Sequence, residues 1–243
     1  MAEVKAPPNT RGLVSIIIPV HNKVKAERCL REIERQTYPN IEVITVEFKG
    51  FPAEKRNYGF RKSRGEYVYF LDEDEYLSPT VVEECVAKAM ESYDVVAVPV
   101  VKKPTKSYMA NSISIIREST FKTMFFKRRV LEDIGLFDPS FTLCDDLELL
   151  ERARGAGYKM AAISKGYLIH DEEVGLKDVV YKTLASRRAF RGLKKKYGKA
   201  KFNQIVRPVF HRKRIFREIL RRPKYIVGVL LTMYIRFITR RLP

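Results

Sequence analysis

The sequence contains no tryptophan and only three cysteines. Cys29, Cys85 and Cys144 are far apart and form no Cys-x-x-Cys pair, so neither a zinc site nor a disulfide framework is indicated. Residues 1–11 lack the apolar core of a signal peptide, and no internal repeat or low-complexity tract is evident. These absences argue against a disulfide-rich secreted protein and a repeat protein, and they predict an active site that faces the cytoplasm.

Acidic residues are scarce at one end of the chain. Residues 187–243 contain 19 lysines and arginines but only one acid, Glu218, whereas residues 1–186 contain 28 residues of each sign. With 243 residues, of which 45% are hydrophobic, the chain can form one sizeable core with an appendage. We therefore predict a neutral domain over residues 1–186 and a strongly basic module over 187–243, whose charge suits nucleic acid or an anionic membrane.

The neutral part begins with alternating strands and helices. Residues 13–20 form an apolar run that is typical of a strand buried on both faces. Helices are predicted over 25–35 and 53–63, and further strands over 41–47 and 66–71. This order predicts an α/β fold with a mostly parallel open sheet flanked by helices, in which ligands bind beyond the carboxyl ends of the strands.

The rest of the neutral part is less regular. The pattern predicts helices over residues 79–92, 128–134 and 145–156, and strands over 94–101 and 158–163. Residues 102–120 are predicted to form a loop or edge hairpin over the site.

The basic module shows amphipathic patterning. A basic helix over residues 179–197 ends at Gly198, and a second stretch from Pro208 places apolar residues on one face and cations largely on another. Such a helix suits the headgroup layer of an anionic membrane. The apolar segment that follows Pro223 amounts to roughly 16 helical residues, or about 24 Å. That is short of a ~30 Å hydrocarbon core, so we expect a shallow or tilted insertion.

Four acids follow the strand at 66–71 directly. Asp72 and Asp74 are two residues apart on an extended segment, so their carboxylates point the same way and can hold a hard divalent cation that also bridges nucleotide phosphates. A solvated acidic turn is the alternative for an isolated motif. The position after the third strand of a βαβαβ unit favours the metal site.

Several segments together resemble family 2 glycosyltransferases of the GT-A fold. They are VSIIIPVHN at 14–22, RNYG at 56–59, GEYVYFLDED at 65–74, GLFD at 135–138 and DD at 145–146. The resemblance covers roughly residues 13–170, with the motifs in family order and spacing. It implies an inverting transferase that uses a nucleotide-sugar donor and Mg²⁺ or Mn²⁺.

The resemblance also assigns residues to the donor and the metal. Asp74 matches the direct metal ligand and Asp72 its partner in the family's Asp-x-Asp motif, while His170 stands where some relatives have a metal-binding histidine. Glu47 replaces the family's usual aspartate at the base or ribose, which leaves the nucleotide open. For Arg56 the alternative is a surface charge on a helix, and for His170 a structural role. The donor contacts implied are Pro19, His21, Asn22, Glu47, Arg56, Asp72 and Asp74.

The pair Asp145–Asp146 matches the family's Glu-Asp pair. This makes Asp146 the candidate general base, which removes the proton from the acceptor hydroxyl. The alternative is an acid favoured at a helix N-terminus by the helix dipole. Gln204 and Arg207 resemble part of the Gln-x-x-Arg-Trp motif of cellulose synthase-like enzymes. With Asp145, they are the candidates to hold the acceptor and the donor diphosphate, although Pro208 takes the place of the tryptophan.

These inferences predict an enzyme that moves one sugar from GDP-mannose or a UDP-sugar to a lipid-linked acceptor at the cytoplasmic face of the cell membrane. The acceptor would be a polyprenyl or dolichyl phosphate or a lipid-linked oligosaccharide, as for a minimal dolichyl-phosphate sugar synthase-like enzyme. The alternative is a non-catalytic protein on a GT-A-like scaffold that binds nucleic acid or membrane through residues 187–222. Interleaved Ile, Phe and Leu favour lipid, so we expect no nucleic acid. A nucleotidyltransferase is disfavoured because no glycine-rich loop follows residues 13–20.

Overall fold

The computed structural model describes residues 12–101, 105–117, 121–141, 143–171, 176–206 and 212–241. The chain forms two compact units. The first comprises Met1–Pro99 and Phe121–Ile169, and the second comprises Val100–Thr120 and His170–Pro243. The division at residue 186 was drawn from charge alone and stays a prediction.

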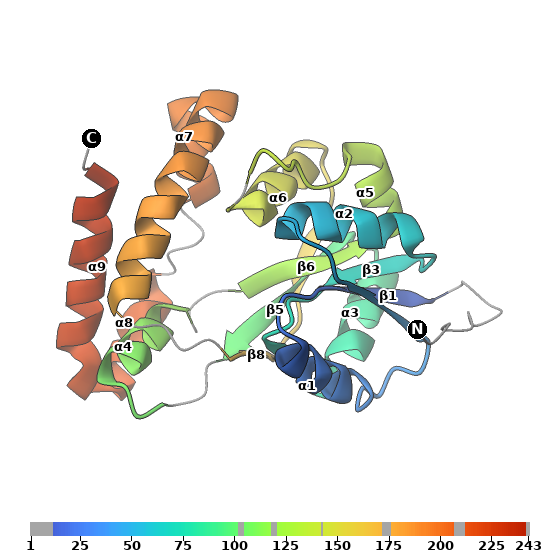
Figure 1. Cartoon of the computed structure of the whole chain (residues 1–243), viewed down its shortest axis with the longest axis horizontal. Helices are drawn as coiled ribbons and strands as arrows, with labels where there is room; N and C mark the ends of the chain where they lie inside the picture. Colours follow the sequence, from blue (N-terminus) through green and yellow to red (C-terminus); the bar gives the residue numbers. More distant parts are fainter. Residues whose placement is uncertain are drawn as a thin grey trace. The chain divides into compact units, whose positions relative to one another are not determined.

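A mixed β-sheet forms the centre of the first unit (Figure 1). Among the described residues it has eight strands in the order β2-β1-β3-β6-β5-β8-β4, with β7 beside β5. The strands are β1 (Val14–Pro19), β2 (Ile41–Val46), β3 (Tyr67–Phe70), β4 (Glu75–Leu77), β5 (Val95–Val101), β6 (Phe121–Lys127), β7 (Met160–Ala162) and β8 (Leu168–His170).

Strand β1 pairs in parallel with β2 and β3, and it is buried along its whole length, as its apolar run predicts. The prediction of a mostly parallel sheet was wrong at the next strand. Strand β6 runs antiparallel to both β3 and β5. It was missed because the buried apolar side chains described in it, Met124, Phe125 and Phe126, form a run too short to separate a strand from other buried structure by pattern.

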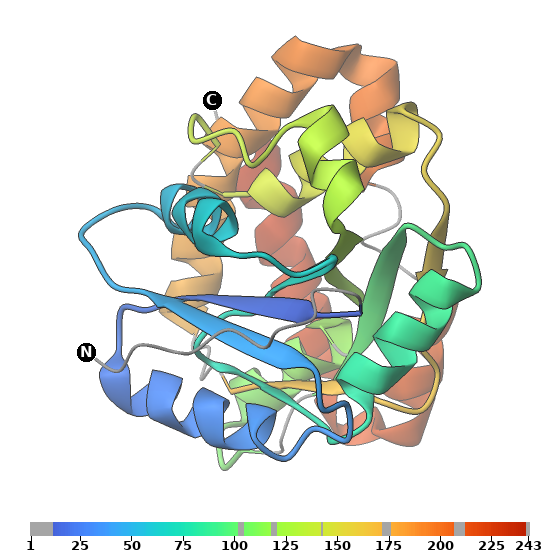
Figure 2. The same ribbon diagram turned by 90° about the vertical axis from the view of Figure 1, so that its right-hand side faces the viewer.

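Helices cover both faces of this sheet. Helices α2, α5 and α6 lie on one face, and α1 and α3 on the other (Figures 1 and 2). Helix α2 can approach β1 closely because Gly59 has no side chain. A Cβ at this position would overlap the side chain of Ile17. The helices are α1 (Lys23–Ile33), α2 (Pro52–Lys62), α3 (Val81–Met90), α5 (Arg128–Ile134) and α6 (Asp145–Gly155).

The second unit is helical in its described part. Helix α9 contacts α4 and α7, and α4 contacts α8. In α7 the backbone of Gly198 leaves the helical conformation with φ 76°, which confirms the predicted break. No helix within the described ranges has both the length and the apolar character needed to cross a bilayer. The elements are α4 (Tyr108–Arg117), α7 (Leu176–Val206), α8 (Arg212–Arg221), the 3₁₀ turn η2 (Pro223–Tyr225) and α9 (Ile226–Arg241).

Helix α4 overturns the predicted loop or edge hairpin. Its sequence, YMANSISIIR, contains Ser, Asn and β-branched residues of modest helix propensity, so packing decides its structure. Ile115 and Ile116 are buried against Ile215 and Val229. A Cβ on Gly228 would overlap the side chain of Ser112, so the two helices touch at backbone distance. The local signal was Ser107, whose Oγ accepts a hydrogen bond from the backbone N–H of Ala110 at 3.2 Å.

Candidate functional site

The acid motif, residues Asp72 to Glu75, follows β3 and forms the turn that leads into β4. The backbone N–H of Glu75 donates to the carbonyl of Asp72 at 3.0 Å, and the backbone N–H of Asp72 donates to the Glu75 carboxylate at 3.1 Å. Glu75 is buried and opens β4, while Asp72, Glu73 and Asp74 are half-buried. The motif is therefore packed against the sheet, and the alternative of a solvated acidic turn is wrong.

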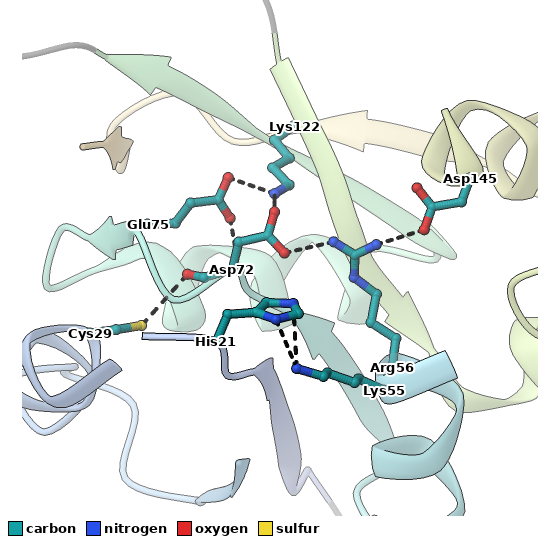
Figure 3. Close-up of polar contacts among 8 residues, drawn as sticks. All are labelled: His21, Cys29, Lys55, Arg56, Asp72, Glu75, Lys122 and Asp145. Atoms are coloured by element: carbon teal, nitrogen blue, oxygen red, sulfur yellow. Dashed lines mark hydrogen bonds and ion pairs between the residues drawn. The ribbon is translucent and has the colours of Figure 1, made fainter. Parts of the chain in front are cut away.

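Asp72 lies between two cations (Figure 3). Its Oδ1 accepts from Nη2 of Arg56 at 2.6 Å, and its Oδ2 accepts from Nζ of Lys122 at 2.6 Å. Arg56 comes from α2 and Lys122 from β6, so the carboxylate joins three elements of the first unit. Burial raises the pKa of Asp72, but Lys122 and Arg56 outweigh it and hold the pKa well below its ordinary value. The group is therefore an anion at every physiological pH.

Arg56 forms a second ion pair on its other side. Its Nη1 donates to Asp145 at 2.7 Å, and its guanidinium lies 5.2 Å from the ring centroid of Phe137. Its side chain is only 7% exposed, so the alternative of a surface helix charge is wrong. Burial raises the pKa of Asp145 against the opposing effect of Arg56, and Asp146 and Asp72 add to the rise. One guanidinium thus connects the acid motif to the Asp145–Asp146 pair.

The segment that leads to this pair is held by its backbone. Asn57 donates to the carbonyl of Phe137 at 2.8 Å and accepts from its N–H at 3.1 Å. Arg152, from α6, donates to the carbonyls of Ile134 and Leu136, each at 2.6 Å. These contacts fix the GLFD segment between α2 and α6, which gives Asn57 and Arg152 a structural role in presenting the acid pair.

Asp146 lies in the first turn of α6. Its Oδ1 accepts from the N–H of Leu147 at 2.8 Å, and its side chain is half-buried. The residue before the pair, Cys144, adopts a left-handed backbone with φ 63°, a conformation that costs a non-glycine residue about 1 kcal/mol or more. The position suits both a general base and a helix N-terminal acid, so the catalytic role stays a prediction.

The predicted donor loop is tied to the acid motif. Glu73 accepts from the backbone N–H groups of His21 and Asn22 at 2.6 and 2.8 Å. Buried Lys55 donates to the carbonyl of Val20 at 2.6 Å, and its Nζ lies 3.0 Å from Nδ1 of His21. Asn22 caps α1 by accepting from Lys25 at 3.2 Å. The loop after Pro19, the end of β1, is thus a fixed part of the site.

The remaining predicted residues differ in their surroundings. Glu47 is 58% exposed and pairs with Lys23 at 3.1 Å. His170 ends β8, and Gln204 is exposed near the end of α7; both belong to the second unit. Arg207 lies outside the described residues. The roles predicted for these four residues stay predictions.

The acid motif fits a metal ion only in part. Carboxylate oxygens suit Mg²⁺ and Mn²⁺, and Asp74 is half-buried with an ion pair to Lys25 at 3.9 Å. Both oxygens of Asp72, however, already accept from protein cations. In the part of the chain that the structure describes, no group of three or more His, Cys, Asp or Glu side chains is arranged to hold a metal. A bound ion would therefore depend on Asp74 together with ligands other than a preformed cluster of three such side chains.

Sequence reasoning missed three members of this cluster. Lys122 stands alone at the start of a strand that the pattern did not reveal. Glu75 ends the acidic run of the sequence, and Lys55 lies within an ordinary predicted helix. Only Glu75 carried a local signal, because it directly precedes the buried apolar pair Tyr76–Leu77.

Comparison with known proteins supports glycosyl transfer as the activity of this chain. Residues 49–145 match the family model described as Glycosyl transferase family 2, a range that includes Arg56, Asp72, Asp74 and Asp145. Over 107 residues the chain is 26% identical to Glycosyltransferase GlyG from Streptococcus pneumoniae serotype 4. That match covers 32% of this chain and 36% of the relative, so the chain corresponds to about a third of that protein's length.

Solved structures share the fold. Mannosyltransferase PcManGT from Pyrobaculum calidifontis, in complex with GDP-Man and Mn²⁺, superposes with a TM-score of 0.58 at 18% identity, covering 95% of this chain and 77% of that chain. S. aureus TarS 1–349, in complex with UDP, superposes with a TM-score of 0.51 at 17% identity, covering 80% and 69%. The family match, the curated relative and these structures together support a glycosyltransferase with a GT-A-like α/β fold.

Proposed function

We propose that this chain is an inverting glycosyltransferase that moves one sugar from a nucleotide-sugar donor to a lipid-linked acceptor. The observation that carries the proposal is the guanidinium of Arg56, which is bound on one side to Asp72 of the acid motif and on the other to Asp145 beside the candidate base. Arg56 therefore holds the acid motif, where the donor would bind, at a fixed distance from the acid pair that contains the candidate base. A displacement reaction between two bound substrates requires such fixed positions.

In the proposed reaction Asp146 takes the proton of the acceptor hydroxyl. The acceptor oxygen forms a bond to the anomeric carbon while the bond from that carbon to the diphosphate oxygen breaks, and the nucleoside diphosphate leaves with the electron pair. An aspartate is a weak base at neutral pH. It suffices when the proton transfers late and the charge on the leaving group is stabilised.

Asp74 is the residue that would hold Mg²⁺ or Mn²⁺. The ion would supply positive charge to the leaving diphosphate. The presence of Mn²⁺ with GDP-Man in PcManGT supports the choice of metal, and the acid motif of this chain supports the position.

The first experiment is a thermal-shift screen of GDP, UDP, ADP and CDP with Mn²⁺, Mg²⁺ or EDTA. We expect GDP or UDP with a divalent ion to raise Tm by several degrees at a large excess over Kd. Asp74→Ala should abolish the metal-dependent part of the shift. Matched GDP-mannose or UDP-sugar donors then test turnover. The proposal fails if no nucleoside diphosphate raises Tm under any of these conditions.

The acceptor side of the proposal rests on the second unit. Large apolar side chains on α8 and α9 are exposed at helical spacing, including Phe216 at 63%, Val227 at 67% and Tyr234 at 61%. Exposed cations lie nearby, among them Arg217 and Arg221 on α8 and Lys224 in the turn η2 between the two helices. An apolar surface accompanied by cations is complementary to an anionic lipid surface. We therefore propose a location on the cytoplasmic face of the membrane with a lipid-linked saccharide as the acceptor, because its sugar supplies the hydroxyl that Asp146 would deprotonate.

Vesicle flotation tests this second step. The full-length protein should float with vesicles of anionic phospholipid more than with neutral vesicles. Val227→Asp combined with Leu230→Asp should lower the partition constant at least about 100-fold, since each buried leucine-sized side chain contributes about 1.5–3 kcal/mol. Met90→Asp is the matched control, because Met90 is 76% exposed but lies on α3 of the first unit. Salt-reversible binding to DNA or RNA without flotation would instead favour the nucleic-acid alternative.

A further inference from the structure

Lys122 stands at the centre of the acid motif without a role in the reaction described so far. Its Nζ lies 2.6 Å from Oδ2 of Asp72 and 2.6 Å from Oε1 of Glu75, and Figure 3 shows both carboxylates in contact with the tip of its side chain. A lysine ammonium has three hydrogens, and these contacts use two of them. The side chain keeps 18% of its surface exposed, so it is accessible from the site.

The same contacts decide what Asp72 can do. One oxygen is bound to Arg56 and the other to Lys122. If Asp72 were to bind a metal directly, one of these 2.6 Å ion pairs would have to break, with the cations left in a half-buried setting where unpaired charge is costly. Asp72 is therefore better suited to holding two protein cations in place than to chelating a metal.

We propose that Lys122 is a diphosphate-binding residue of the donor site, positioned by Asp72 and Glu75. Its third ammonium hydrogen donates to a phosphate oxygen of the nucleotide donor and stabilises the charge that the leaving diphosphate acquires. A cation held by two carboxylates is preorganised, and its hydrogen bonds to phosphate are charge-assisted. The proposal rests on the proposed function and adds to it a second source of positive charge, independent of the metal.

A purely structural role is the competing explanation. Glu75 is 1% exposed, and Lys122 could serve only to neutralise it. The two explanations differ in what happens when both charges of the buried pair are removed together. Replacing both partners removes the charges of this pair together and is often close to neutral for stability, while Asp72 keeps its ion pair with Arg56 at 2.6 Å. A structural lysine then becomes dispensable, but a phosphate ligand does not.

The experiment measures Kd by calorimetry for GDP or UDP, whichever the wild type binds, and Kd for guanosine or uridine by NMR titration, all with Mg²⁺. The variants are Lys122→Met, Glu75→Gln and Glu75→Gln/Lys122→Met. Lys127→Met is the matched control: Lys127 is on the same strand, is also 18% exposed and also pairs with an aspartate, Asp94, at 3.6 Å. Circular dichroism and Tm establish that each variant is folded.

We expect the double variant to bind the nucleoside diphosphate about 10- to 100-fold more weakly than Glu75→Gln, as for the loss of one hydrogen bond to a charged group. The nucleoside, which has no phosphate, should bind both variants within about 3-fold, and Lys127→Met should behave as wild type. Equal affinity of the double variant and Glu75→Gln for the diphosphate would overturn the role of Lys122 and leave the proposed function standing. Failure of the wild type to bind either diphosphate would overturn both.

Discussion

The two units of this protein use charge in opposite ways. At the site of the first unit the cations are buried and paired: as whole residues, Arg56 is 6% exposed and Lys55 1%, and each has its partners on neighbouring elements. In the second unit several apolar side chains are exposed, with Val227 at 67% and Phe216 at 63%, and cations such as Lys224 face solvent. The net charge of +18 therefore says little about the site, where Arg56 and Lys122 are paired with carboxylates.

This difference indicates where each kind of function should be sought. Buried, paired charge is costly to assemble and makes side-chain positions specific, which suits a reaction centre. Exposed apolar and basic side chains need no specific partners within the protein, and they suit binding to a membrane surface. The four changes below test this division. Those at Asp146 and Arg56 concern the chemistry of the site, and those at Gly228 and Asp94 concern the stability of the two units.

The largest effect should come from Asp146. Asp146→Asn keeps the shape of the side chain but removes its ability to accept a proton, so we expect transfer to fall at least about 1,000-fold, within the range known for general bases combined with positioning. Binding of the nucleoside diphosphate with metal should remain within a few-fold, measured by calorimetry on the same sample. Turnover near the wild-type rate would remove Asp146 as the base.

Arg56 tests whether the buried pairs are needed for the site to exist. Arg56→Met leaves Asp72 and Asp145 without their shared partner, so we expect activity to fall about 100-fold. The free energy of unfolding should fall by about 3–5 kcal/mol, because a buried ion pair loses one member. Arg61→Met on the exposed side of the same helix should leave both quantities nearly unchanged. If the two variants behave alike, Arg56 contributes no more than a surface charge.

Gly228 tests the packing of the second unit by itself. Gly228→Ala places a methyl group against Ser112 where α9 meets α4, and overpacking should destabilise this unit by about 1–3 kcal/mol. Gly155→Ala is the control, since a Cβ there meets no atom within 4 Å. Urea unfolding should show the loss for Gly228→Ala alone, and nucleotide binding should be unaffected in both. Equal stability of the two variants would show that α4 and α9 can separate at no cost.

The smallest effect should come from Asp94. Burial raises its pKa, but hydrogen bonds from Arg129 at 2.6 Å and the Lys159 N–H at 3.0 Å outweigh it, and the pKa lies below its ordinary value. The folded state therefore holds the ionised form, which contributes stability above about pH 4 and loses it as the pH falls through the lowered pKa. Asp94→Asn should cost about 1–2 kcal/mol at pH 7 and flatten the acid limb. An unchanged profile of Tm between pH 7 and pH 3 would contradict this.

Local patterns predicted the first half of the fold well, and packing explains the rest. The apolar run of β1 and the acids after β3 are contiguous in sequence, so the order βαβαβ and the place of Asp72 and Asp74 could be predicted from them. Helix α4 and strand β6 could not, because their apolar residues are few and their structure depends on partners far along the chain. Likewise, Arg56 was expected to face the nucleotide, but nothing in the sequence shows that its guanidinium is bound to Asp145, 89 residues away.

Helix α2 carries Arg56 and Asn57 side by side, and these adjacent residues have unrelated partners. Arg56 holds the carboxylates of Asp72 and Asp145, while Asn57 holds the backbone of Phe137. Each residue of an α-helix advances by about 100° around the axis. A one-residue insertion or deletion between Pro52 and Lys55 would therefore turn both side chains away from their partners at once. This helix should tolerate substitution on its exposed face but no change of length, so length variation among natural variants should avoid it.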